Sequence, residues 1–331
     1  MKNDQLLICY FPTNIMFVDD NQRFLKSVKF KLEENQSHVL YDNPEEALSY
    51  LQNEYHPNPN IGTLNANADS YYALQTHTAF DLDVSHIAKQ VLNPGRFDEI
   101  SVLITDYSMP TMDGITFCKK VRNFPIKKIL VTGEADESLA VTAFNEGDID
   151  RFILKSNPNF DSLLKTYIHE LQQQYFQEIT KSTLDMLHHN KNFGLNSVAS
   201  MEVFNKILKE KKIVEYYLLD TTGSFLLLDK DGKTYWFVVQ NEEDRNTCLD
   251  FATDNGAPEQ LISDLKECKK LVYLWNVDDG VDIEGDRWES VAYKSEKLAD
   301  SSCCYALLNQ INGAKIDISN VSSYANYMNG K

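Results

Sequence analysis

Short apolar runs in the first half of the chain end in side chains that can do chemistry. These side chains are a carboxylate pair, a single carboxylate, a hydroxyl and an amine, at Asp19-Asp20, Asp106, Thr132 and Lys155. A carboxylate can attack a phosphoryl group, and a hard cation held by neighbouring carboxylates offsets the negative charge. An amine and a hydroxyl can contact the oxygen atoms of the phosphoryl group that the cation does not contact. The residue types therefore suit cation-assisted phosphoryl chemistry if the fold brings them together.

The elements that must position these residues alternate between apolar runs and amphipathic segments. The apolar runs, expected to be buried strands, cover 15–18, 38–41, 102–105, 129–131 and 152–154. Apolar residues at helical spacing occupy the intervening segments, at 21–34, 44–51, 112–122 and 137–146. This alternation predicts an α/β fold with a doubly wound parallel sheet of five strands. Ligands bind at the carboxyl ends of such strands, where the reactive positions lie.

One segment carries a specific resemblance. Asp106-Tyr-Ser-Met109-Pro110-Thr-Met-Asp-Gly114 resembles the phospho-acceptor loop of the CheY-like receiver domains of two-component response regulators. Val131-Thr132-Gly133 is similar to the hydroxyl position of that family, and Lys155 is similar to its lysine. The resemblance covers about 14–175, apart from 55–97, and implies a flavodoxin-like receiver fold. The sequence departs from the family at Ser156, where a proline usually follows the lysine.

The resemblance implies a chemical role for each reactive residue. Asp106 would accept the phosphoryl group, while Lys155 and Thr132 would contact two of its oxygen atoms. The cofactor would be Mg²⁺, held by three carboxylates and one backbone carbonyl, those of Asp19, Asp20, Asp106 and Ser108.

Other residues would shape the phospho-acceptor loop or change conformation when the site is phosphorylated. Met109, Pro110 and Gly114 would shape the loop. Thr132 and Phe152 would form the switch, in which the aromatic ring turns inward when the threonine follows the phosphate. A plain core aromatic is the alternative interpretation of Phe152.

The first half of the chain also holds a long insertion at about 55–97. Its proline, glycine and asparagine residues interrupt the strand and helix pattern. The apolar side chains of Tyr71, Tyr72, Phe80 and Leu82 indicate more than a linker. The insertion could be a cap that binds a partner or supports a dimer. The alternative is a segment that packs on its own domain and has no binding role.

A helical pattern runs from 159 to 189, which is long for a globular helix. Its apolar stripe, which includes Phe176 and Ile179, exceeds what a receiver needs to cover its sheet. We interpret the stripe as a contact surface through which two phosphorylated chains pair. Packing on the second domain within one chain is the alternative.

We expect three parts along the chain. These are a receiver domain at 1–158 with its insertion, a last receiver helix and helical connector at 159–200, and a smaller α+β output domain at 201–331. Asp231-Gly232 predicts a tight hairpin between strands at 225–229 and 234–239. Acidic residues crowd 278–289, which we interpret as a solvated loop rather than a metal site.

Composition narrows the possible functions. The chain has 331 residues and a formal net charge of −17, which disfavours direct nucleic-acid binding. No apolar run approaches the roughly 18 residues of a membrane helix, and the start does not resemble a signal peptide, so we expect a cytoplasmic protein. None of the six cysteines forms a C-x-x-C motif. We expect buried, reduced thiols, with Cys303-Cys304 as the pair to test for redox activity.

The resemblance implies a response regulator that takes its phosphoryl group from a sensor histidine kinase or a phosphotransfer protein. The layout is similar to that of the insertion-bearing response regulators of Legionella-type quorum-sensing systems. No independent catalytic site is recognised in the second half of the chain. Output would be a conformational change, dimerisation or protein contact. The alternatives are a transcription factor with an unfamiliar DNA-binding domain and a receiver-controlled enzyme.

Overall fold

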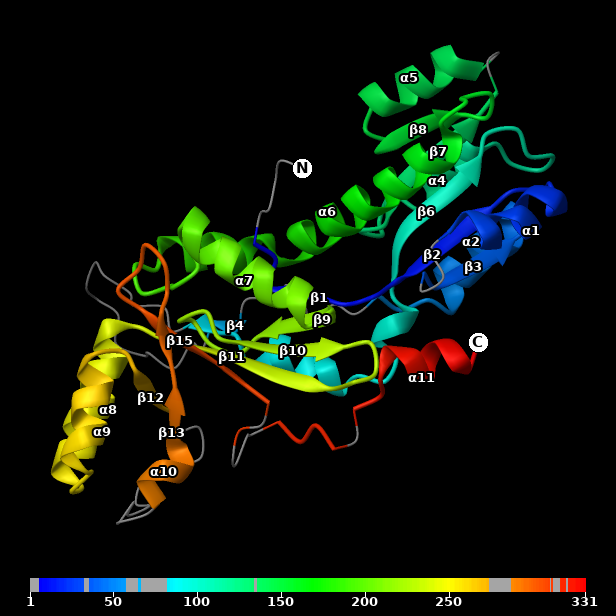
Figure 1. Cartoon of the computed structure of the whole chain (residues 1–331). Helices are drawn as coiled ribbons and strands as arrows, with labels where there is room; N and C mark the ends of the chain where they lie inside the picture. The colour runs from blue at the N-terminus through cyan, green and yellow to red at the C-terminus, as the bar shows by residue number, and fades with distance from the viewer. Residues whose placement is uncertain are drawn as a thin grey trace. The chain divides into compact units, whose positions relative to one another are not determined.

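The computed structural model describes residues 6–32, 36–57, 65–66, 82–133, 136–273, 287–309, 311, 316–319 and 321–331. The chain forms two compact units (Figure 1). The parallel-sheet unit comprises Phe11–Pro59, Gly95–Lys181 and Gly330–Lys331. The antiparallel-sheet unit comprises Met1–Tyr10, Asn60–Pro94 and Ser182–Asn329. Within the described residues, no helix is long and apolar enough to cross a membrane.

These units differ from the sequential division predicted above. The segments Met1–Tyr10 and Asn60–Pro94 group with the C-terminal half, and two of their described elements contact one strand of its six-stranded sheet. Strand β1 (Cys9–Tyr10) pairs antiparallel with β9 (Ile213–Leu218), and helix α3 (Ser85–Ala88) packs against β9. The insertion is therefore part of the second unit rather than an appendage of the first.

The parallel-sheet unit has the predicted α/β architecture. Its strands run in the order β3-β2-β6-β7-β8, and every neighbouring pair is parallel. The strands are β2 (Asn14–Val18), β3 (His38–Tyr41), β6 (Ile100–Asp106), β7 (Lys127–Thr132) and β8 (Arg151–Leu154). Because consecutive side chains alternate between faces, Met16 and Val18 join one core while Ile15 and Phe17 join the other.

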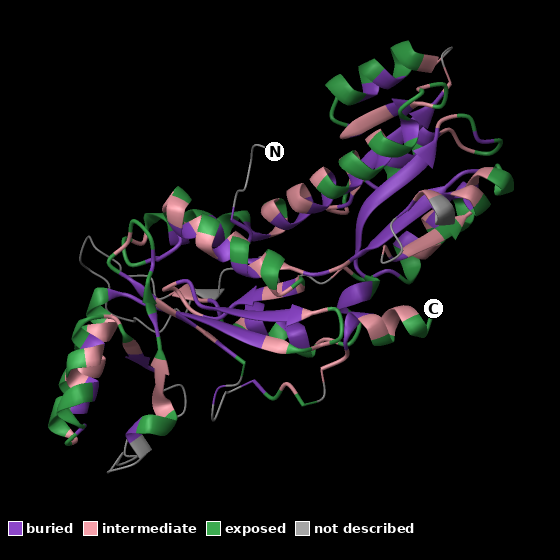
Figure 2. Ribbon diagram, in the orientation of Figure 1, coloured by how far each residue is buried: buried purple, intermediate pink, exposed green. Residues whose placement is uncertain are grey.

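Helices cover both faces of this sheet, as a doubly wound fold requires. They are α1 (Gln22–Lys31), α2 (Pro44–Asn53), α4 (Gly114–Lys120), α5 (Glu137–Asn145) and α6 (Phe160–His189). Helices α2, α4 and α5 contribute to the core with Met16, whereas α1 and α6 contribute to the core with Phe17. Asn21, Asn43 and Asp113 cap α1, α2 and α4 by accepting backbone hydrogen bonds. Figure 2 shows these helices with buried inner and exposed outer faces.

Helix α6 confirms the long predicted helix, but the predicted free stripe on it is wrong at Phe176. The Phe176 side chain is fully buried, and its ring lies 4.9 Å from that of Phe11. Ile179 is half-buried. At Phe176 the stripe therefore packs within its own chain, while pairing of two chains through the rest of the stripe stays a prediction.

The two ends of the insertion are held together by a buried carboxylate. Glu99 Oε1 accepts hydrogen bonds from the hydroxyls of Tyr55, at 2.7 Å, and Tyr175, at 2.5 Å. The Tyr55 hydroxyl also accepts a hydrogen bond from the backbone N–H of Ile100 at 3.1 Å. The Glu99 carboxylate thus holds together the places where the chain leaves and re-enters the parallel sheet. Helix α6 is bonded to the same carboxylate through Tyr175. The predicted aromatic residues Tyr71, Tyr72 and Phe80 lie outside the described residues.

The antiparallel-sheet unit is built on a six-stranded sheet in the order β1-β9-β10-β11-β15-β14. Its other strands are β10 (Phe225–Asp229), β11 (Thr234–Gln240), β14 (Glu296–Lys297) and β15 (Cys304–Leu308). The predicted hairpin joins β10 to β11, with Gly232 at φ +84° and Asp229 Oδ1 accepting from the Asp231 and Lys233 N–H groups. Helix α7 (Val198–Glu210) lays Phe204 against Phe225 and Phe237 of this sheet.

A second group of elements in this unit has its own small core. It consists of α8 (Glu242–Asp254), α9 (Glu259–Lys266), β12 (Lys270–Val272), α10 (Arg287–Val291) and β13 (Ala292–Lys294), and we call it the side lobe. Strand β12 pairs antiparallel with β13, and Leu261, Leu265 and Trp288 are buried among the lobe's side chains. Most of the predicted acidic loop at 278–289 lies outside the described residues.

The remaining elements are short. They are β4 (Asn65–Ala66), β5 (Leu82–Asp83), α11 (Tyr324–Asn329) and two 3₁₀ turns, at Lys89–Leu92 and Arg96–Asp98. The cysteines correct one prediction: the thiols are not all reduced, because Cys268 and Cys304 form a disulfide. Cys9, Cys118 and Cys303 are buried free thiols, as expected.

Removal of the Tyr55 hydroxyl tests how the insertion is anchored. Tyr55→Phe leaves the ring in place but removes a buried donor to Glu99 and the acceptor of the Ile100 N–H. We expect a loss of about 1–3 kcal/mol in the free energy of unfolding, measured by urea denaturation. Tyr50→Phe is the matched control, because the Tyr50 ring packs beside Tyr55 while its hydroxyl has no hydrogen-bond partner among the described residues. Equal stability of the two variants would contradict the anchoring role.

Candidate functional site

The predicted reactive residues meet at the carboxyl edge of the parallel sheet. Strands β2, β6, β7 and β8 are neighbours in space, so Asp19, Asp106, Thr132 and Lys155 lie side by side at their ends. Lys155 Nζ lies 2.8 Å from Asp106 Oδ1 and 3.5 Å from Asp19 Oδ2. The Lys155 backbone N–H donates to the Thr132 carbonyl at 2.8 Å, which fixes the start of the lysine loop.

Three carboxylates share this site. Oxygen atoms of Asp19, Asp20 and Asp106 all lie within 4.8 Å of one another. Asp19 and Asp106 are buried, whereas Asp20 is exposed to solvent. We call these three residues the acidic cluster.

The pKa of Asp19 is raised at its buried position in the acidic cluster. Burial is the main cause that raises its pKa, and the charges of Asp106 and Asp20 add to the rise. The Asn21 backbone N–H, which donates to Asp19 Oδ1 at 2.8 Å, and the Lys155 ammonium both act in the opposite direction. Asp19 Oδ2 is buried and accepts no hydrogen bond from the described residues. A carboxylate in this state would gain from a further positive charge.

The donor set fits a divalent cation of the hard type. Lys155 forms ion pairs with two of the three carboxylates, those of Asp19 and Asp106. Carboxylate oxygens are the ligands that Mg²⁺ prefers. Asp19 Oδ2, which accepts no hydrogen bond from the described residues, could serve as one metal ligand, and the exposed Asp20 would leave room for water. Ser108, whose backbone carbonyl is the predicted fourth ligand, lies in the same loop two residues after Asp106.

The loop after Asp106 is fixed by the backbone and by one glycine. The Tyr107 carbonyl accepts from the Met109 N–H at 3.2 Å and from the Gly114 N–H at 3.0 Å. A Cβ atom on Gly114 would lie 2.3 Å from the Asp106 carbonyl oxygen, so no larger residue fits. Met109 is buried and Pro110 is exposed.

The two predicted switch residues occupy different environments. Thr132 is fully buried, and its hydroxyl donates to the Gly133 carbonyl at 3.3 Å rather than to the acidic cluster. Phe152 is half-buried on β8 and packs on the core that holds α2, α4 and α5. Their coupling to phosphate stays a prediction.

Asn21 is a site residue that the sequence interpretation missed. It donates its backbone N–H to Asp19 while its side chain caps α1 by accepting from the Arg23 and Phe24 N–H groups. An asparagine directly after an acidic pair and before an amphipathic segment is the cap signal that could have identified it.

Comparison with known proteins places this geometry in a family. A model of the response regulator receiver domain matches residues 69–167, which include Asp106, Thr132 and Lys155. The Legionella pneumophila response regulator LqsR is 34% identical in sequence, with a TM-score of 0.79 over 98% of this chain and 95% of that one. A search of curated proteins gave no match.

Two other solved structures resemble about half of the chain. An uncharacterised protein from Neptuniibacter caesariensis is 21% identical, covers 51% of this chain and 93% of its own, and has a TM-score of 0.35. An adenylate cyclase from Rhodopirellula baltica is 20% identical, covers 54% of this chain and 99% of its own, and has a TM-score of 0.36. Similarity at this level carries no functional argument. The identity and coverage shared with LqsR, together with the receiver match, show that this chain belongs to the response regulators of two-component signal transduction.

Proposed function

We propose that this response regulator accepts a phosphoryl group on Asp106, in the presence of Mg²⁺, from a sensor histidine kinase or a phosphotransfer protein. The observation that carries the proposal is the Lys155–Asp106 ion pair of 2.8 Å within the acidic cluster. Bound Mg²⁺ would supply positive charge to the oxygen atoms of the transferring group. Asp19, Asp20, Asp106 and the Ser108 carbonyl would hold it.

The side chains of the site have distinct tasks in this reaction. An Asp106 carboxylate oxygen forms a bond to phosphorus while the bond from phosphorus to the donor nitrogen breaks. The Lys155 ammonium already faces Asp106, so it can neutralise a phosphoryl oxygen without a large movement. Thr132, next to Asp106 at the sheet edge, would exchange its contact with Gly133 for one with the phosphate.

The output would be contact between two phosphorylated chains, and α5 is the surface that favours it. Leu139, Val141 and Phe144 of α5 are between 42% and 46% exposed, although large apolar side chains usually avoid water. Helix α5 packs against β8, which carries Phe152. A change at the switch residues would therefore reach this apolar surface directly. A role in quorum sensing, implied by the resemblance to the Legionella-type regulators, belongs to the same proposal.

Replacement of the acceptor tests the central step. Asp106→Asn removes the nucleophile, so incubation with acetyl phosphate and Mg²⁺ should give no phosphoprotein by intact-protein mass spectrometry. Asp113→Asn is the matched control, since asparagine caps α4 as well as aspartate does. Phosphorylation of the Asp106→Asn protein at the wild-type level would place the acceptor elsewhere.

Magnesium should stabilise the folded protein through the acidic cluster. At a tenfold excess over its dissociation constant, the metal should raise the melting temperature of wild type by about 3 °C. Asp20→Asn should lose most of this rise because it removes an exposed ligand charge. Asp42→Asn, at an exposed carboxylate outside the cluster, should keep the rise. If Asp20→Asn keeps the full rise, the metal binds at a different place.

Phosphorylation-dependent pairing can be tested on α5. Leu139→Glu with Phe144→Glu places charge in the exposed apolar surface, so this protein should take up phosphate yet stay monomeric in sedimentation velocity experiments. Wild type should associate only when phosphorylated. Phosphorylated wild type that sediments as a monomer at tens of micromolar would exclude this output.

A further inference from the structure

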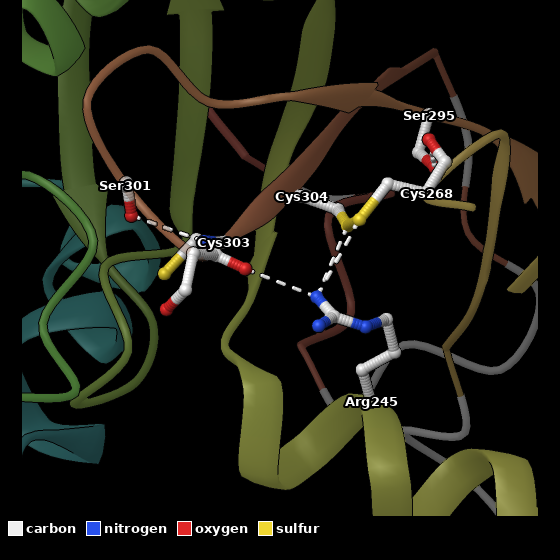
Figure 3. The surroundings of a disulfide bond; sticks show 7 residues. Arg245, Cys268, Ser295, Ser301, Cys303 and Cys304 are labelled. Atoms are coloured by element: carbon white, nitrogen blue, oxygen red, sulfur yellow. Dashed lines mark hydrogen bonds between the residues drawn. A yellow bond between two sulfur atoms is a disulfide. The ribbon is translucent and has the colours of Figure 1, made fainter. Parts of the chain in front are cut away.

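The antiparallel-sheet unit contains a cysteine pair that the receiver chemistry does not use. Cys268 follows α9 in the side lobe, Cys304 begins β15 of the six-stranded sheet, and a disulfide joins them across 36 positions of sequence (Figure 3). Arg245 of α8 lies over both sulfur atoms, with Nη1 3.4 Å from Cys304 Sγ and 3.5 Å from Cys268 Sγ. A guanidinium at this distance favours the thiolate form of a reduced cysteine.

The backbone at Cys268 indicates that its side chain has a use. Helix α9 ends in a Schellman motif, in which the Cys268 N–H donates to the Leu265 carbonyl and the Lys269 N–H donates to the Asp264 carbonyl. Cys268 occupies the left-handed position of that motif, with φ +56°, where glycine is the favoured residue. The Ser295 hydroxyl donates to the Cys268 carbonyl at 2.9 Å and holds this conformation. Cys268 thus occupies a left-handed backbone position that favours glycine, and from there its sulfur reaches Cys304 of β15.

The neighbouring free thiols lack these features. Cys303 Sγ faces away from the disulfide in Figure 3 and packs toward Gly194, and burial raises the pKa of its thiol. Burial likewise raises the pKa of Cys248, to about 11. The charge of Arg245 acts in the opposite direction on the pKa of Cys303, but no hydrogen bond among the described residues joins Arg245 to the sulfur of Cys303 or Cys248; its third hydrogen bond goes to the Ser302 carbonyl at 3.0 Å. The environment therefore separates the Cys268–Cys304 pair from the other cysteines of the unit.

We propose that Cys268 and Cys304 form a reversible dithiol–disulfide switch that low-molecular-weight disulfides such as oxidised glutathione set. Cys268 is half-exposed and Cys304 is buried, so the Cys268 thiolate is the first to attack a sulfur atom of the small disulfide. A mixed disulfide forms between Cys268 and one half of the small molecule, while the S–S bond of the small disulfide breaks and its other half leaves as a thiol. The Cys304 thiolate then attacks Cys268 Sγ and releases the second thiol. The two protein thiols lose two electrons, and their two protons leave with the released thiols.

The disulfide links the side lobe covalently to the six-stranded sheet and so limits movement of the lobe relative to the sheet. Besides the chain itself, the attachment of the lobe to the sheet includes the Arg245–Ser302 hydrogen bond and the Gln240 side chain, which donates to the Val272 carbonyl at 3.2 Å. Helix α8 and the Ser301–Cys303 loop also line a polar cavity of about 710 Å³. Reduction would remove the covalent link between lobe and sheet and loosen one wall of that cavity.

The test uses the full-length protein, reduced and then exposed to oxidised glutathione, with peptide mass spectrometry as the readout. We expect a Cys268–Cys304 disulfide that dithiothreitol reverses, while Cys248 and Cys303 stay alkylatable. Cys304→Ser should trap glutathione on Cys268. Arg245→Gln should slow bond formation about threefold to tenfold, because less thiolate is present. Cys303→Ser should form the bond at the wild-type rate.

Three results would overturn the proposal. The first is a disulfide that involves Cys303 or Cys248 in wild type, and the second is no glutathione adduct on Cys268 in Cys304→Ser. The third is a wild-type rate in Arg245→Gln, whose fold is checked by its unfolding temperature. Hydrogen exchange gives an independent readout: reduction should speed exchange in α8 and α9 and leave α1 and α2 unchanged. Equal exchange of α8 and α9 in both redox states would show that the bond controls no movement.

Discussion

Repulsion among three carboxylates is the constraint on which the parallel-sheet unit depends. Parallel strands deliver Asp19, Asp20 and Asp106 to one edge, and their oxygen atoms lie within 4.8 Å of one another. Lys155, from the end of a fourth strand, supplies positive charge at 2.8 Å from Asp106. Burial, followed by the charges of Asp106 and Asp20, raises the pKa of Asp19, and Asp19 Oδ2 accepts no hydrogen bond from the described residues, although Lys155 Nζ lies 3.5 Å away. A site with this excess of negative charge suits the divalent cation of the proposed function, which would in turn offset the charge of a phosphoryl group.

The second constraint is that a long insertion must leave this edge undisturbed. The insertion departs after α2 and returns before β6, at the edge opposite the carboxyl ends of the strands. Glu99 closes its two ends through Tyr55, and the same carboxylate binds Tyr175 of α6. Because a buried carboxylate is costly without donors, this arrangement defines one geometry for the ends of the insertion. The insertion therefore leaves and re-enters the parallel sheet away from the edge that carries the reactive residues.

Much of the parallel-sheet unit could be predicted because its signals are local. Apolar runs ending in Asp106, Thr132 or Lys155 indicated both the strands and the site, and Gly114 marked the close approach that the structure shows. Features that depend on pairing across long separations could not be predicted. The pairing of Cys9–Tyr10 with β9, the burial of Phe176 under Phe11 and the choice of Cys268 as partner for Cys304 all have this origin. Spacing along the sequence does not reveal which distant segment supplies a neighbour.

The position of the phosphoryl group on the phosphorylated protein decides whether Asp106 is the acceptor. Borohydride reduces an aspartyl phosphate to homoserine, and peptide mass spectrometry then identifies the residue that carried it. After phosphorylation of wild type in Mg²⁺, we expect homoserine at position 106 and unchanged Asp19 and Asp20, as the proposed acceptor role of Asp106 requires. Homoserine at position 19 or 20, or a stable phosphate on another residue with Asp106 unmodified, would contradict it.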